Sequence, residues 1–138
     1  MIKFEYPEKL HPSFVNITTN QHDVIVWEGG RGGAKSEALA AISIAESFID
    51  DGVILCCREI QKSINDSLYA TIVSAISKYK IESYFKILQN EITNLVTGAK
   101  FIFAGLKSNI TNIKSINKLR VVLTDEAENI TQNSWDYL

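Results

Sequence analysis

The chain has 138 residues, of which 46% are hydrophobic and 22% charged, as expected for one globular domain with a hydrophobic core. Its formal net charge of -2 does not favour a DNA-gripping domain, which would more often carry a basic surplus. No apolar run is long enough to span a bilayer and the N-terminal residues lack a signal-peptide stretch, so we expect a cytoplasmic protein with no membrane partner.

The two cysteines are adjacent. Cys56 and Cys57 lie in the apolar run Val53–Cys57, which predicts buried, reduced thiols. His11 and His22 are isolated in the sequence, so no cysteine–histidine metal centre is expected.

The first half of the chain predicts a strand, a helix and a second strand. Residues 1–20 are expected to form an irregular lead-in. Val24–Trp27 is short, β-rich and apolar, which predicts a fully buried strand. A helix is predicted over Ser36–Asp50, with Gly52 as its stop signal, and Val53–Cys57 is the second buried strand.

The second half adds a helix, a hairpin and a last strand. Apolar residues at helical intervals predict a helix from Ile60 to about Lys80. Ile92–Val96 and Lys100–Ala104 flank a glycine turn and predict a hairpin. We expect a short helix over Asn109–Ile116 and a buried strand over Leu119–Thr124.

This order of elements predicts an α/β domain with a mainly parallel sheet. In such sheets the ligand lies at the carboxyl ends of the strands. Two candidate motifs fall at that edge, one after Trp27 and one after Thr124.

The first motif is a predicted phosphate-binding loop. Its residues are Gly29, Gly30, Arg31, Gly32, Gly33, Ala34, Lys35 and Ser36. Glycines allow backbone N–H groups to approach phosphate oxygens, and the helix that begins near Lys35 adds its positive end. We expect Lys35 to reach the β- and γ-phosphates and the Ser36 hydroxyl to take one Mg²⁺ position. Arg31 is expected to direct its charge toward phosphate or a nearby acid. The alternative for the whole segment is a glycine-rich turn with a solvated lysine and no bound ligand.

Ala34 stands where the strict pattern of such loops has glycine. Alanine adds only a methyl group and tolerates helical dihedral angles. We therefore expect a modest effect on the loop, unless the position needs a positive φ.

The second motif is the acidic end of the last strand. Asp125 is placed to hold Mg²⁺ directly or through water, and Glu126 to orient or deprotonate an attacking water. The alternative for this pair is a strand-to-loop cap of acidic residues, and Glu128 is interpreted as a solvated acid. Arg58 follows the second strand and is expected either to contact nucleotide, to act as an arginine finger in a neighbouring subunit, or to be a surface arginine that caps a helix.

Four stretches resemble the ATPase part of the large subunit of tailed-phage terminase. Gly29–Ser36 resembles the arginine-containing Walker A loop of that family, and Cys57-Arg58 with Ser63 and Ser67 is similar to the segment after its second strand. The third and fourth stretches are Phe103–Leu106 with Ile113–Ser115, and the Walker B-like Val121–Glu128 with Ser134, Trp135 and Leu138. The stretch Phe103–Leu106 with Ile113–Ser115 is more specific than the Walker motifs, which fit many ATPases.

The resemblance implies a P-loop NTPase fold of the additional-strand, catalytic-glutamate (ASCE) type. It implies ATP hydrolysis with Mg²⁺, with Glu126 as catalytic carboxylate and Asp125 as the metal-holding residue. It further implies a homo-oligomeric ring at the capsid portal, a terminase small-subunit partner, double-stranded DNA as the translocated substrate, and a bacterial host cell as the location.

Members of this family are several times longer than this chain. In the wider ATPase class the strand after Walker B inserts between the Walker A and Walker B strands. We therefore expect residues 1–138 to form a partial ATPase domain, truncated after the Walker B strand, without the nuclease domain and with unpaired strand edges.

Three alternatives stay open. A helicase-type ATPase fits Asp125–Glu128, which resembles the helicase Asp-Glu-Ala-Asp box, although the arginine in the loop argues against it. A second alternative is a non-catalytic remnant that binds nucleotide or a partner without turnover. The last is an α/β domain whose loop binds nothing.

Overall fold

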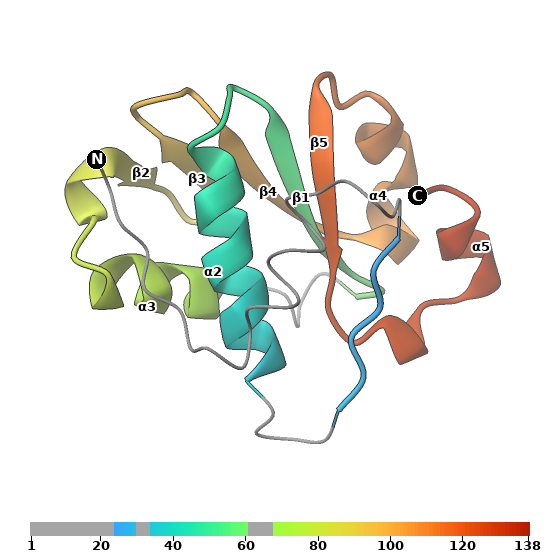
Figure 1. Ribbon diagram of the computed structural model, residues 1–138. Helices are drawn as coiled ribbons and strands as arrows, with labels where there is room; N and C mark the ends of the chain where they lie inside the picture. The colour runs from blue at the N-terminus through green and yellow to red at the C-terminus, as the bar shows by residue number, and fades with distance from the viewer. Residues whose placement is uncertain (1–23, 30–33, 61–67) are drawn as a thin grey trace.

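The computed structural model describes residues 24–29, 34–60 and 68–138 (Figure 1). The predictions for the lead-in and for four loop residues lie outside these ranges; the four are Gly30, Arg31, Gly32 and Gly33.

A five-stranded sheet in the order β2-β3-β4-β1-β5 organises the chain. The strands are β1 (Val53–Arg58), β2 (Phe85–Ile87), β3 (Glu91–Asn94), β4 (Lys100–Gly105) and β5 (Leu119–Thr124). β1 pairs in parallel with β4 on one side and β5 on the other, whereas β2–β3 and β3–β4 are antiparallel. The sheet is therefore mixed, which corrects the prediction of a mainly parallel sheet. The antiparallel pairs follow from short connections, because only a crossover can return a strand in parallel.

β1 is the central strand because its sequence suits burial on both faces. The side chains of Ile54, Leu55, Cys56 and Cys57 are completely buried. Its neighbours supply main-chain hydrogen bonds on both edges, so a continuous apolar run is stable there.

Helices cover both faces of the sheet (Figure 1). On one face, α2 (Lys35–Ser47) and α3 (Ala70–Lys78) pack against Ile54, Cys56 and Phe101. On the other, α4 (Leu106–Lys114) and the residues before α5 (Gln132–Trp135) pack against Leu55 and Cys57. In the described part of the chain, two 3₁₀ turns complete the elements, η4 (Glu82–Tyr84) and η5 (Ala127–Asn129). Among the described residues, no helix has both the length and the apolar character needed to cross a membrane.

Most predicted elements are confirmed with shifted ends. β5 has the predicted bounds, and the predicted hairpin is β3 with β4. The described part of the helix predicted from Ile60 is regular α-helix only from Ala70, after a short π-helical stretch at residues 68–69. β2 was not predicted, because three residues around a charged Lys86 carry too short a pattern.

The predicted buried strand Val24–Trp27 is wrong. These residues have no regular secondary structure, and Val24 and Val26 are 75% and 80% exposed. Trp27 packs against Ala41 and Ile42 of α2, and β5 pairs only with β1 among the described residues. An apolar run becomes a buried strand only where a neighbouring strand satisfies its N–H and C=O groups, and no described strand does so here.

Arg120 of β5 ties the end of α2 to the sheet. Its Nε donates to Glu46 at 3.0 Å, and its Nη1 also bonds to Asp50. A Cβ on Gly52 would lie 2.8 Å from Asp50 Oδ1 and 2.9 Å from Arg120 Cβ. Gly52 is therefore required for this close approach, besides ending the helical segment.

A second clamp joins α2 to the hairpin. The Asn94 amide is fully buried and donates to the Ser47 carbonyl at 3.1 Å and to its hydroxyl at 3.0 Å. The Thr97 hydroxyl donates to the same carbonyl at 2.7 Å. Two of these bonds satisfy the Ser47 carbonyl, which lies in the last turn of α2 and has no acceptor role within the helix.

Replacing this buried amide tests the clamp. Asn94→Ala is expected to lower the free energy of unfolding by about 1–3 kcal/mol, because it removes two buried hydrogen bonds. Urea unfolding measures the loss. The matched control is Asn133→Ala at an exposed asparagine, expected within about 0.5 kcal/mol of the unmodified chain. Equal losses for the two variants would contradict the role of Asn94.

Candidate functional site

The first turn of α2 and the carboxyl ends of β1 and β5 lie at the same edge of the sheet (Figure 1). The chain direction explains this, because parallel strands all end at one edge and the helix runs back from it. Lys35 and Ser36, predicted for phosphate and metal, therefore share one side of the molecule with the predicted acids Asp125 and Glu126.

The start of α2 is suited to an anion. Ala34 precedes the helix and provides no side-chain cap, and the first backbone bond of the helix runs from the Ala38 N–H to the Ala34 carbonyl at 2.9 Å. The first N–H groups of an α-helix have no acceptor in a preceding turn, and the positive end of the helix dipole favours an anion there. The Lys35 ammonium lies at the same point, where it donates to the Gly29 carbonyl.

Ala34 adopts the left-handed conformation, with φ 58° and ψ 18°. This is the case in which alanine does not simply replace glycine, because a side chain at positive φ costs roughly 1–2 kcal/mol. The expectation of a modest effect on the loop was conditional on a negative φ, and the condition is not met.

Arg58 joins the two candidate acids. Its guanidinium donates to Asp125 Oδ2 from Nη2 at 2.6 Å and from Nε at 3.2 Å, and its Nη2 lies 3.3 Å from Glu126 Oε1. The Arg58 and Asp125 side chains are only 11% and 15% exposed, whereas Glu126 is 50% exposed. The alternative of a surface arginine is therefore wrong, because the charge is buried against carboxylates of the same chain.

Main-chain geometry fixes the two acids. The Asp125 N–H donates to the Cys57 carbonyl at 3.1 Å, which continues the pairing of β5 with β1 by one residue. Glu126 is left-handed, with φ 54° and ψ 48°, and its N–H donates to Asp125 Oδ1 at 3.1 Å. A non-glycine residue in this region is uncommon, and such residues cluster at functional sites.

A cavity of about 240 Å³ opens beside these acids. Its lining residues are Arg58, Glu59, Ile60, Glu126 and Asn129.

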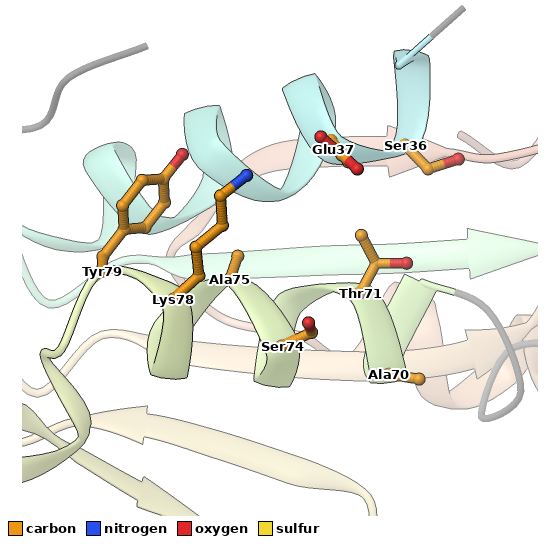
Figure 2. A pocket seen from close by; sticks show the side chains of 8 residues that line it. All are labelled: Ser36, Glu37, Ala70, Thr71, Ser74, Ala75, Lys78 and Tyr79. Atoms are coloured by element: carbon orange, nitrogen blue, oxygen red, sulfur yellow. The ribbon is translucent and has the colours of Figure 1, made fainter. Parts of the chain in front are cut away.

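A second hollow, of about 390 Å³, runs between α2 and α3 (Figure 2). It starts at Ser36 and Glu37 on α2 and reaches Lys78 and Tyr79 at the end of α3, with Thr71 and Ser74 between them. Burial, and next the charge of Glu37, raise the pKa of Tyr79, so its phenol stays protonated at neutral pH. The groove thus extends from the Ser36 end of the candidate site, but its lining has one acid and one base rather than a carboxylate pair.

The cysteines take no part in this chemistry. Both are free and buried, as predicted. Burial raises the pKa of Cys57 to about 11 and that of Cys56 well above its ordinary value. Because only the thiolate is a strong nucleophile, neither residue is reactive at neutral pH. Among the described residues, no three or more histidine, cysteine, aspartate or glutamate side chains gather as a metal centre.

The residues present suit one Mg²⁺ ion with a bound phosphate. Mg²⁺ prefers oxygen ligands and commonly binds through one or two carboxylates plus substrate phosphates. Ser36 and Asp125 supply such oxygens at the same edge, although Asp125 already accepts bonds from Arg58 and from the Glu126 N–H.

Three polar residues of the site were missed from the sequence. Glu59 lines the cavity and accepts hydrogen bonds from Thr131, and Asn129 Nδ2 lies 3.5 Å from Glu126 Oε2. The available signals were weak: Glu59 follows Arg58 at a strand end, and Thr131 begins a short capped helix.

The fold and these contacts define an α/β protein whose helix start and charged strand ends share one edge, an arrangement common among proteins that bind phosphate groups. Residues 21–138 match the model of the phage terminase large subunit family, so the chain belongs to that family. The chain is also 27% identical over 122 residues to the terminase large subunit of Bacillus phage SPP1, a match that covers 84% of this chain and 29% of that protein. It therefore spans less than a third of the length of the curated relative that it matches.

Glycine at position 34 should relieve the strain at the start of α2. Ala34→Gly is expected to raise the free energy of unfolding by roughly 0.5–1 kcal/mol, because relief of the left-handed alanine exceeds the entropy that glycine adds to the unfolded chain. The matched control is Ala45→Gly within α2, expected to lower it by roughly 0.5–1 kcal/mol. Urea unfolding of both variants checks the sign, and a loss in both would be inconsistent with a strained Ala34.

Proposed function

We propose that this chain binds ATP with Mg²⁺ and supplies the ATPase site of a phage DNA-packaging motor, which powers DNA translocation into procapsids. Three features support the proposal: the family match, the uncapped start of α2, and the paired acids at the same edge. The helicase-type alternative is set aside, because the family match is to terminases.

One observation carries the proposal furthest. Arg58 holds the carboxylates of Asp125 and Glu126 together at the ends of two parallel strands. A simple acidic cap would leave these carboxylates in solvent. Their organisation by a buried guanidinium is instead typical of a site at which charge is used.

The residues have distinct proposed roles. Lys35 and the N–H groups of the loop hold the phosphates, with Arg31 as an additional charge, while Ser36 and Asp125 hold the ion. When bound, Mg²⁺ neutralises the charge that develops on the phosphates. Glu126 orients or deprotonates the attacking water.

Arg58 organises the acids in this proposal. Its guanidinium bonds to Asp125 and lies beside Glu126, so a role within the chain is favoured over one as an arginine finger in a neighbouring subunit. Truncating it would leave two neighbouring carboxylates without their shared counter-charge.

The proposed partners follow from the family. They are double-stranded phage DNA, the terminase small subunit and the portal, with assembly into a homo-oligomeric ring. These partners are proposed for the whole packaging protein. This chain covers 29% of the relative from Bacillus phage SPP1.

A second candidate function is nucleotide binding without turnover. The same ion pairs favour it. Glu126 is the proposed acceptor of the water proton, and its carboxylate is already held by Arg58 and lies beside Asn129. Binding and turnover therefore need separate tests.

Calorimetry with ATP and Mg²⁺ tests binding. Lys35→Ala is expected to weaken binding about 10- to 100-fold, because a charge-assisted contact to phosphate is lost. The control is Lys86→Ala on β2 at the far edge of the sheet, expected to bind like the unmodified chain. Equal affinities for all three proteins would refute the phosphate assignment.

Phosphate release tests catalysis. Glu126→Gln is expected to reduce turnover by about 10²-fold or more, because the amide cannot accept a proton. Glu128→Gln is the matched control, since Glu128 is exposed two residues further along, and it should keep full turnover. If the unmodified chain releases no more phosphate than Glu126→Gln, the binding-only function holds.

A further inference from the structure

The segment that carries Glu126 is tied at both ends to the end of β1. At its start, the Asp125 N–H donates to the Cys57 carbonyl. At its other end, the Thr131 hydroxyl and N–H donate to the two oxygens of the Glu59 carboxylate, at 3.1 and 3.4 Å. Because Cys57 and Glu59 are two residues apart, residues 125–131 form a loop closed over one strand end.

The anchor between Glu59 and Thr131 is held in place by packed neighbouring residues. The Glu59 carbonyl accepts the Lys107 N–H from the first turn of α4 at 3.1 Å. Ile130, next to Thr131, is buried in the cluster with Leu106 and Ile113. The carboxylate of Glu59 therefore reaches Thr131 from a fixed main chain.

Between the anchors lies the strained residue. Glu126 is left-handed, and the Asn129 N–H donates to its carbonyl at 2.9 Å. A non-glycine residue stays in this conformation only where the surrounding contacts over-determine it. The contact between Glu59 and Thr131 is one side-chain contribution to that closure, beside the bonds of Arg58 to the two acids.

We propose that Glu59 and Thr131 form a positioning pair that sets the place of Glu126 for ATP hydrolysis, an inference that rests on the proposed function. Glu59 acts through Thr131 and through the loop, and not on the substrate. Because Glu59 also lines the cavity beside Glu126, the competing role is that of a second carboxylate acting directly on the attacking water.

Hydrogen exchange tests the structural half of the proposal without nucleotide. Glu59→Ala and Thr131→Val are each expected to speed exchange of the Asn129 and Ile130 amides about tenfold, because loss of the anchor opens the loop. Amides of β5 should be unaffected, and Glu128→Gln is the control. Unchanged exchange in residues 125–131 would overturn the proposal, whatever the result for ATP turnover.

Steady-state kinetics, below the melting temperature of every variant, tests the functional half. Each substitution is expected to lower kcat about tenfold with KM unchanged. Thr131→Ser keeps the hydroxyl, including its bond from the Ser134 N–H, and should restore kcat. The double variant Glu59→Ala with Thr131→Val should lose no more than Glu59→Ala alone, since Glu59→Ala already removes both bonds to Thr131.

Glu59→Gln separates positioning from direct catalysis. Its amide oxygen still accepts from the Thr131 hydroxyl, so most of kcat should remain. If Glu59→Gln lowers kcat as much as Glu59→Ala does, while Thr131→Val keeps full activity, Glu59 acts directly on the reaction. That outcome would overturn the positioning role. If the unmodified chain has no turnover, the comparison with Glu126→Gln rejects the proposed ATPase activity. The exchange experiment then still tests whether Glu59 and Thr131 hold the loop.

Discussion

The double-sided burial of β1 is the constraint on which the rest of the structure depends. Its apolar residues require a helical layer on each face and a strand on each edge. Arg58, the last residue of the strand, is buried too, and a buried guanidinium needs acceptors. Asp125 and Glu126 meet that need from the end of the neighbouring strand, so the packing of β1 also assembles the charged part of the site.

α2 connects the two ends of the molecule. Its first turn carries Lys35 and Ser36 of the proposed phosphate site, while its last turn is bonded to Asn94 and its Glu46 to Arg120. Because both clamps reach strands of the sheet, the helix and the sheet form one unit. A group bound at the start of α2 therefore meets a helix that is fixed in position at its other end.

The charges described at the strand ends do not balance one another. One guanidinium stands against two carboxylates, so the acids are only partly compensated. Glu126 remains half exposed, which leaves it accessible from the adjoining cavity. Its left-handed main chain and the contact of Glu59 with Thr131 give this exposed acid a defined place.

The sequence by itself determined the elements whose signals are local. The apolar runs of β1 and β5, the glycine turn of the hairpin and the acids after Thr124 needed no partner to be recognised. Tertiary structure decided what depends on partners: the exposure of Val24 and Val26, the direction of Arg58 and the anchoring of Thr131 by Glu59. The last contact joins residues 72 positions apart, and local patterns carry no information about such pairs, because they exist only once the strands have paired in register.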